Sequence, residues 1–472
     1  MNSDDNYFQD EEFREMLEDY ERTVKAGQLV FMDADDLADI ADYYQQEGRF
    51  DDAQQALDRA LELEPDSVVA LNYLIHNALN NDDFDAAEEY LEQIEDHDVP
   101  EYTYCRAEIW IAQGEIEKAD QYLRQCFRKI DPEEHQDFVL DAANLYTDYG
   151  YSEKAMEWMM RARQENSEDF KELMARTLFG LGKYDDSERI FNELIDKNPF
   201  QKRYWNALAN TQFMKEDYGA AVSSSEYAIA IDPNDGEGLL AKANGLYQLE
   251  NYEQALEFYQ RYSQLYPDDE FGLLHQGSCF INMERFEEAV DVLKEASEKS
   301  PEDSPYLVEI YQELCFAYSE MKMPETAIYY IEQTERLDCN HNDMEVIKGH
   351  VLLANKRMVE AENTFKHAIM SSDNSLRTMM RIIISLYDNR YVETAYKMFK
   401  NFFEQTDDNW NDGYAYMALC CYDLKRDDEF MSYLEKACQR NPQEAKAVLG
   451  HLFPQGMKPG EYYDYMMEQT TH

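Results

Sequence analysis

Side chains capable of chemistry are scattered through this sequence and do not form a catalytic pattern. The phosphate-binding motifs GxxxxGK[ST] and GxGxxG, the HExxH zinc motif and the GxSxG nucleophile motif are all absent. The histidines are dispersed, and His341 and His350 are separated by a spacing that does not put two ligands on one helix face. We therefore expect no catalytic residue, no metal and no cofactor.

Two further groups of residues have simple structural interpretations. Asp33, Asp35, Asp36 and Asp39 are acidic enough for a calcium loop, but the run lacks the glycine and the closing glutamate of an EF-hand. We expect these aspartates to stabilise the start of a helix through its dipole. The 8 cysteines form no CxxC pair, and most lie within helical patterns. They predict buried thiols in a reducing compartment, without disulfides or a zinc site.

The elements that must position any functional side chain follow from a repeated spacing. Pro199, Pro233, Pro267 and Pro301 occur at a constant interval of 34 residues, which indicates a helical repeat. Within each interval, apolar residues at positions 4, 7, 8 and 11 form one face of a first helix, and those at 20, 24 and 27 form one face of a second. Small residues at positions 8 and 20 let the two helices approach closely. Proline at position 32 ends the second helix, because it lacks an N–H group.

This pattern resembles the tetratricopeptide-repeat family, and the resemblance extends over nearly the whole chain. It implies an all-α fold, a right-handed superhelical solenoid of about twelve helix-turn-helix units with terminal capping helices. The expected boundaries are residues 1–33 for an N-terminal capping helix, 34–444 for twelve repeats, and 445–472 for a C-terminal capping helix and tail. The expected units begin at Ala34, Val68, Pro100, Gln136, Glu168, Lys202, Gly236, Glu270, Val308, Asn342, Leu376 and Asn411.

The resemblance also indicates which side chains would contact a partner. In this family, positions 2, 5, 9 and 12 of the first helices face the inside of the superhelix and usually contact a ligand peptide. Asparagine offers a donor and an acceptor to any peptide bond, aromatic rings offer flat apolar surface, and arginine pairs with carboxylate. The expected partner-binding residues are Asn144, Arg176, Phe179, Arg203, Asn206, Asn210, Phe213, Asn244 and Tyr247. The alternative is that these residues occur on exposed faces by chance or pack against the next unit.

Some members of the family grip the C-terminal carboxylate of chaperone tails with lysine, asparagine and arginine at fixed positions. Here Asn206 stands where lysine is needed. Arg377 and Arg381 occupy two of the required positions in unit eleven, but the preceding units offer Phe316 and His350 in place of asparagine. Neither arrangement is complete, so we do not expect a chaperone-tail clamp.

The charge of the chain restricts its partners. The sequence has 43 basic and 99 acidic residues and a net charge of −56. Such a surface repels phosphate backbones and anionic lipids, so neither nucleic acid nor membrane is expected as a partner. The charge either serves solubility or attracts a basic partner. It is unevenly spread: residues 348–401 contain more basic than acidic side chains, whereas the first sixty residues are strongly acidic.

The N-terminus has neither a basic region nor an apolar stretch of the kind found in signal peptides, and no apolar run is long enough for a membrane span. We therefore expect a cytoplasmic protein. The leading hypothesis is a non-enzymatic scaffold or adaptor that binds an extended peptide in the concave groove. The alternatives are an acidic chaperone or inhibitor that wraps a basic protein, and a structural spacer or self-assembling solenoid. The sequence leaves the oligomeric state open.

Overall fold

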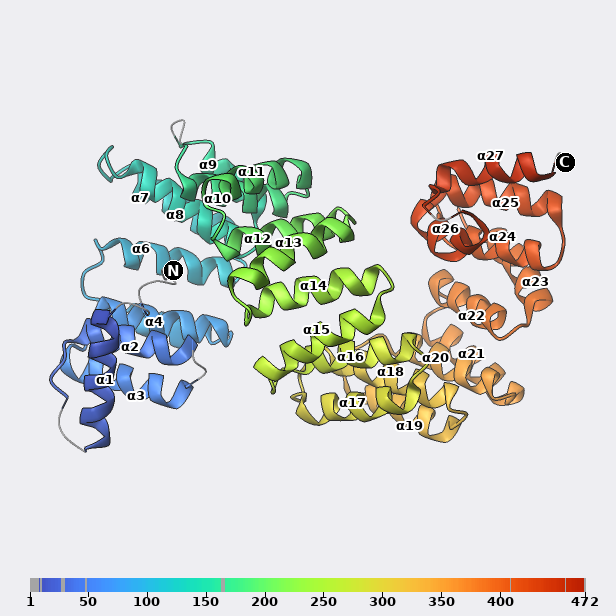
Figure 1. Cartoon of the computed structure of the whole chain (residues 1–472), viewed down its shortest axis with the longest axis horizontal. Helices are drawn as coiled ribbons and strands as arrows, with labels where there is room; N and C mark the ends of the chain where they lie inside the picture. The colour runs from blue at the N-terminus through green and yellow to red at the C-terminus, as the bar shows by residue number, and fades with distance from the viewer. Residues whose placement is uncertain are drawn as a thin grey trace. The chain divides into compact units, whose positions relative to one another are not determined.

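The computed structural model describes residues 8, 11–26, 30–46, 49–162, 166–407, 409–454 and 456–470. Within these ranges helices follow one another along the chain, joined by short turns, and no strand occurs (Figure 1). The chain divides into two compact units, Met1–Asp217 and Tyr218–His472. The all-α prediction is confirmed, and each unit is described below by itself.

In unit 1 the helices that follow α1 pack as consecutive pairs, α2 with α3, α4 with α5, and so on to α10 with α11. The helix α1 places Phe13 and Tyr20 in a core shared with α2 and α3, as expected of a cap. The helices of unit 1 are α1 (Glu11–Lys25), α2 (Ala34–Gln46), α3 (Phe50–Leu63), α4 (Val68–Asn80), α5 (Phe84–Leu91), α6 (Pro100–Ala112), α7 (Ile116–Phe127), α8 (His135–Asp148), α9 (Ser152–Met159), α10 (Glu168–Gly180), α11 (Tyr184–Lys197) and α12 (Lys202–Met214).

In unit 2 the same pairing runs from α14 with α15 to α24 with α25, and α13 packs against α14. The helices of unit 2 are α13 (Tyr218–Ile231), α14 (Gly236–Gln248), α15 (Tyr252–Leu265), α16 (Glu270–Asn282), α17 (Phe286–Lys299), α18 (Leu307–Glu320), α19 (Pro324–Gln333), α20 (His341–Ala354), α21 (Met358–Ser371), α22 (Leu376–Asp388), α23 (Val392–Phe403), α24 (Tyr414–Asp423), α25 (Asp427–Arg440), α26 (Pro442–Leu449) and α27 (Pro459–Thr470). Short 3₁₀ turns follow α19 and α26.

The helix boundaries fit the repeat spacing. The first helix of each expected unit begins at the expected residue or within one residue of it, except in the last unit, where α24 begins at Tyr414 instead of Asn411. The segment before α24 turns through Gly413, whose φ of 84° is left-handed and whose N–H donates to Glu444 Oε1 at 2.8 Å. The C-terminal segment forms two helices rather than one helix and a tail, because Pro459 starts a new helix, α27.

The turn inside each repeat has a constant backbone form. The residue at position 15 has a positive φ in every unit for which that residue is described. The following N–H then bonds to a carbonyl five residues back, as Asn251 does to Leu246 at 2.9 Å, which closes the end of the first helix. These residues are Asp82, Gly114, Gly150, Gly182, Glu216, Glu250, Glu284, Lys322, Lys356, Arg390 and Lys425.

Close approach of the paired helices explains the small residues at position 8. A Cβ added at Gly277 would lie 2.4 Å from Leu293 Cδ2, and one added at Gly349 would lie 2.2 Å from Phe365 Cε1. Both distances are far below van der Waals contact, so the second helix of each pair occupies the space that a side chain would need. The first helices are thereby held in place, and their opposite faces carry the candidate site.

Two expectations concern the environment of the chain. All 8 cysteines are free thiols, and Cys105, Cys279, Cys315, Cys420 and Cys421 are buried. In the ranges described, no helix combines the length and the apolar character that a bilayer span requires.

Candidate functional site

The nine expected partner-binding residues are called the ladder below. Its members in α8 and α10 are joined to each other by hydrogen bonds. Arg176 Nη1 donates to Asn144 Oδ1 at 3.0 Å, and Asn144 Nδ2 donates to Asp148 Oδ2 at 2.8 Å. Arg176 also forms an ion pair with Asp148. The structure therefore brings Asn144 and Arg176 together, and the polar groups of both also contact the carboxylate of Asp148.

These two residues line a polar cavity of about 430 Å³ between α8 and α10. Burial raises the pKa of Glu172, although Arg203 and Arg176 act in the opposite direction. Arg203 Nη2 lies 2.9 Å from Glu172 Oε2, so this arginine is also paired within unit 1. The cavity is lined by Asp137, Leu140, Asp141, Asn144, Asp169, Glu172, Leu173 and Arg176.

The remaining ladder residues of unit 1 differ in how far their side chains are exposed. Asn206 is only 2% exposed, so its side chain is not open to a partner. Asn210, Phe213 and Phe179 are partly exposed, and the ring of Phe179 packs against Tyr184 at a centroid distance of 5.6 Å.

The two ladder residues of unit 2 have internal hydrogen-bond partners. The hydroxyl of Tyr259, on α15, donates to Asn244 Oδ1 at 2.6 Å. The hydroxyl of Tyr247 accepts from Asn282 Nδ2 at 2.9 Å. The side chain of Asn244 therefore links α14 to α15 by a hydrogen bond within unit 2.

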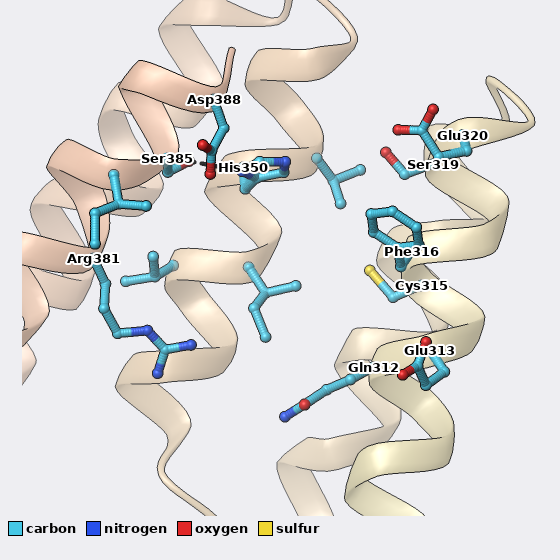
Figure 2. Close-up of a pocket in the computed structure, with 14 residues that line it drawn as sticks. Gln312, Glu313, Cys315, Phe316, Ser319, Glu320, His350, Arg381, Ser385 and Asp388 are labelled. Carbon is cyan, nitrogen blue, oxygen red and sulfur yellow. Dashed lines mark hydrogen bonds between the residues drawn. The ribbon is translucent and has the colours of Figure 1, made fainter. Parts of the chain in front are cut away.

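An apolar opening in unit 2 lies between three first helices, α18, α20 and α22 (Figure 2). It has a volume of about 460 Å³. The ring of Phe316 stands in it and is 46% exposed, although the adjacent Cys315 is fully buried. An aromatic ring left half in water within a cavity is a surface that a partner can cover. The lining residues are Gln312, Glu313, Cys315, Phe316, Ser319, Glu320, Val346, Ile347, His350, Val351, Arg381, Ile384, Ser385 and Asp388.

His350 lines this cavity, and its Nδ1 contacts two polar side chains. Asn389 Nδ2 donates to the backbone carbonyl of Ser385 at 2.9 Å, which identifies it as the amide nitrogen, and it lies 3.3 Å from His350 Nδ1. An amide N–H₂ group only donates, and Ser385 Oγ, 3.1 Å from the same Nδ1, can donate too, so both contacts favour the neutral ring with its proton on Nε2. Burial lowers the pKa of His350, so the neutral form is favoured. His350 thus offers an N–H donor on a ring that lines the cavity.

Carboxylates lie around the apolar floor. Burial raises the pKa of Glu313 to about 7, with Glu309 adding to the effect and a hydrogen bond from Ser278 opposing it. Burial also raises the pKa of Asp388. Arg381 is paired with Asp343, so its charge is largely compensated. The cavity therefore combines an apolar centre with excess negative charge.

Sequence reasoning placed the binding ladder in units four to eight and did not select this cavity. Position 9 of three successive units supplies Phe316, His350 and Ile384 to it. The sequence places Phe316 and His350 at the position that carries asparagine in earlier units, but it gives no sign that Phe316 is left half-exposed. In the ranges described, no three histidine, cysteine, aspartate or glutamate side chains are arranged to hold a metal ion.

Comparison with known proteins gives the same repeat pattern. Family models described as tetratricopeptide repeat match residues 44–109, 173–236 and 240–304. A tetratricopeptide-repeat-containing protein of Bacillus subtilis (strain 168), YpiA, is 26% identical over 171 residues. That match covers 35% of this chain and only 40% of the relative's own length.

Solved structures are similar at low sequence identity. A thermophilic tetratricopeptide-repeat protein of Thermus thermophilus, TTC0263, is 21% identical, with a TM-score of 0.32, over 40% of this chain and 100% of that one. The Cut9–Hcn1 hetero-tetramer of the APC/C matches at 15% identity and a TM-score of 0.39, over 89% of this chain and 76% of that one. MamA from Desulfovibrio magneticus RS-1 matches at 17% identity and a TM-score of 0.34, over 36% of this chain and 93% of that one.

Proposed function

Because the chain is a tetratricopeptide-repeat protein and hence a protein-interaction scaffold, we propose that it binds an extended polypeptide segment along the faces of its first helices. The principal site is the cavity between α18, α20 and α22. The protein acts by holding this partner, without catalysing a reaction on it.

The observation that carries this proposal is the half-exposed ring of Phe316 inside that cavity. Covering such a ring removes apolar surface from water, and buried aromatic anchors dominate the energetics of most interfaces. A cavity of about 460 Å³ is large enough for one or two side chains of a peptide but too small for a folded domain. An extended segment is therefore the form of partner that fits it.

Display of a random peptide library on phage tests the proposal. The wild-type chain should enrich related sequences, and Phe316→Glu should lose that enrichment, because a charge replaces the apolar anchor. Val359→Glu is the matched control, since Val359 is 72% exposed on the second helix α21 and does not line the cavity. The proposal fails if the wild type enriches no sequence family, or if Phe316→Glu retains the same family.

The ladder residues of the first helices belong to the same proposal as secondary contacts. Substitution of Asn244 is a poor test of them, since alanine there leaves the hydroxyl of Tyr259 without its acceptor, and Tyr259 is almost fully buried. Asn210→Ala probes the ladder in unit 1, where Asn210 is partly exposed. We expect it to weaken peptide binding several-fold while the helical circular dichroism stays unchanged.

A second candidate function is favoured by the polar cavity of unit 1. Asp137, Asp141, Asp169 and Glu172 line it together with a single arginine, so a lysine or arginine of a partner would be attracted there. This supports a chain that wraps a basic protein. Its affinity for such a partner should fall steeply between about 0.05 and 0.15 M salt, because screening shortens the reach of charges to about 8 Å at the upper concentration. An affinity that does not respond to salt would contradict it.

A further inference from the structure

The cavity of unit 2 has an apolar middle and two acidic ends. Figure 2 shows Glu320 and Asp388 toward one end, Glu313 toward the other, and Phe316 between them. His350 is electrostatically coupled to both Asp388 and Glu320, which places the imidazole within reach of the two carboxylates. The arrangement therefore alternates charge, apolar surface and charge along α18.

Positive charge within the cavity is scarce. Arg381 is committed to Asp343, and the pKa of His350 is lowered by burial, so that the ring is neutral at pH 7. Glu320 has Lys322 only at 4.0 Å, in an exposed pair that contributes little. Arg390 acts on Asp388 without forming an ion pair with it. The carboxylates are thus left with charge that a ligand can neutralise.

The spacing of the carboxylates sets the spacing of the ligand. Glu313 and Glu320 lie seven residues apart on one helix, which corresponds to about 10 Å along its axis. An extended peptide covers this length in about three residues. In an extended peptide, the side chains two residues before and two residues after a central residue point to the same face and lie about 13 Å apart. Long basic side chains are flexible enough to bend inward and match the separation of about 10 Å between the two glutamates.

We propose that this cavity takes an extended peptide segment in which one large apolar side chain is flanked, within two residues on each side, by lysine or arginine. The apolar side chain covers Phe316, and the cations face Glu313 at one end and Glu320 with Asp388 at the other. The Nε2–H of His350 donates to a carbonyl of the peptide backbone. This inference rests on the proposed function, because it specifies the chemistry of the segment bound at the same site.

Fluorescence anisotropy with four labelled nine-residue peptides tests it on the full chain at 0.15 M salt. The peptides carry a central leucine flanked at both second positions by lysine, serine or glutamate, and the fourth keeps the lysines but has a central serine. We expect the lysine–leucine peptide to bind at least tenfold tighter than the serine-flanked peptide. The glutamate-flanked peptide and the peptide without leucine should bind more weakly still.

A pair of variants separates the cavity from the general acidity of the surface. The double variant Glu320→Gln with Asp388→Asn should reduce the advantage of lysine over serine flanks at least threefold and leave binding of the serine-flanked peptide unchanged. The control is Glu257→Gln with Glu298→Gln, which removes the same charge from exposed positions on the second helices α15 and α17. This control should keep the full advantage.

The outcomes distinguish the two proposals. If no peptide binds the wild type, the proposed function fails together with the inference. If lysine-flanked and serine-flanked peptides bind equally, the peptide-binding function stands and the inference is overturned. The inference is also overturned if the control pair lowers the lysine advantage as much as the cavity pair does, since the preference then arises from overall charge. Circular dichroism of each variant identifies any that has lost its fold.

Discussion

Replacement of Glu313 by glutamine should stabilise unit 2 in a pH-dependent way. Glu313 lies on α18 and lines the cavity. The groups that act on it are Glu309 on its own helix and Ser278 on α16. Neither is a cation, so only the hydrogen bond from Ser278 opposes the desolvation of the ionised carboxylate.

The size of the effect follows from the pKa. Burial raises the pKa of Glu313 from 4.5 to about 7 in the folded chain. The folded state therefore binds this proton more tightly than the unfolded state does. The stability it contributes is fully present below pH 4.5 and is lost as the pH rises toward 7. A shift of this size corresponds to at most about 3 kcal/mol. Glutamine does not ionise, so Glu313→Gln should match the wild type near pH 4.5 and be more stable by about 2–3 kcal/mol at pH 8.

Hydrogen exchange is the suitable assay, because a repeat array opens in segments and does not unfold in one step. The opening free energy of α18 amides, corrected for the intrinsic exchange rate, would be compared at pH 5 and pH 8 for both proteins. Glu298→Gln, at an exposed position on α17, is the matched control and should show no such change between the two pH values. The reasoning is refuted if the difference between Glu313→Gln and the wild type is the same at both pH values.

Other predictions concern the packing that holds the first helices in place. Gly349→Ala should destabilise α20 and α21 by about 1–2 kcal/mol, because the new Cβ meets the buried ring of Phe365 and overpacking outweighs the gain in helix propensity. Gly219→Ala, where a Cβ meets nothing within 4 Å, should instead stabilise its helix by up to about 1 kcal/mol. Hydrogen exchange of the amides near each site should therefore become faster in Gly349→Ala and slower in Gly219→Ala. Trp158→Phe should lower the opening free energy of the α9 amides by about 2 kcal/mol in hydrogen exchange, since Trp158 Nε1 donates to the buried carboxylate of Asp120 at 3.0 Å. Unchanged exchange of these amides would contradict this.

A carboxylate that lowers stability fits a binding role. Functional groups are often kept in positions that cost the folded state free energy. The lysine or arginine proposed to face Glu313 would stabilise its ionised form, so the affinity for a basic peptide should rise between pH 5 and pH 8. Glu313→Gln should flatten that dependence.

The repeat architecture could be predicted from the sequence because its signals are local. Helical periodicity, small residues at position 8 and proline at position 32 all act within one unit, and each unit contacts mainly its neighbours. The glycines at positions 114, 150 and 182 also mark the left-handed residue of the turn, although in most units a polar or charged residue adopts that conformation, and the sequence offers no sign of it.

The candidate site depended on tertiary structure, because exposure is set by how neighbouring units pack. Phe316 is half-exposed in a cavity while Cys315 beside it is buried. Asn206, at a position expected to contact a partner, is buried as well. Asn244 meets the hydroxyl of Tyr259 from the other helix of its repeat, which no spacing rule predicts. The sequence by itself determined the repeats and their helices. The tertiary structure decided which of those side chains are engaged by their neighbours and which are left open, because that depends on the sizes and polar groups of residues brought together from different helices.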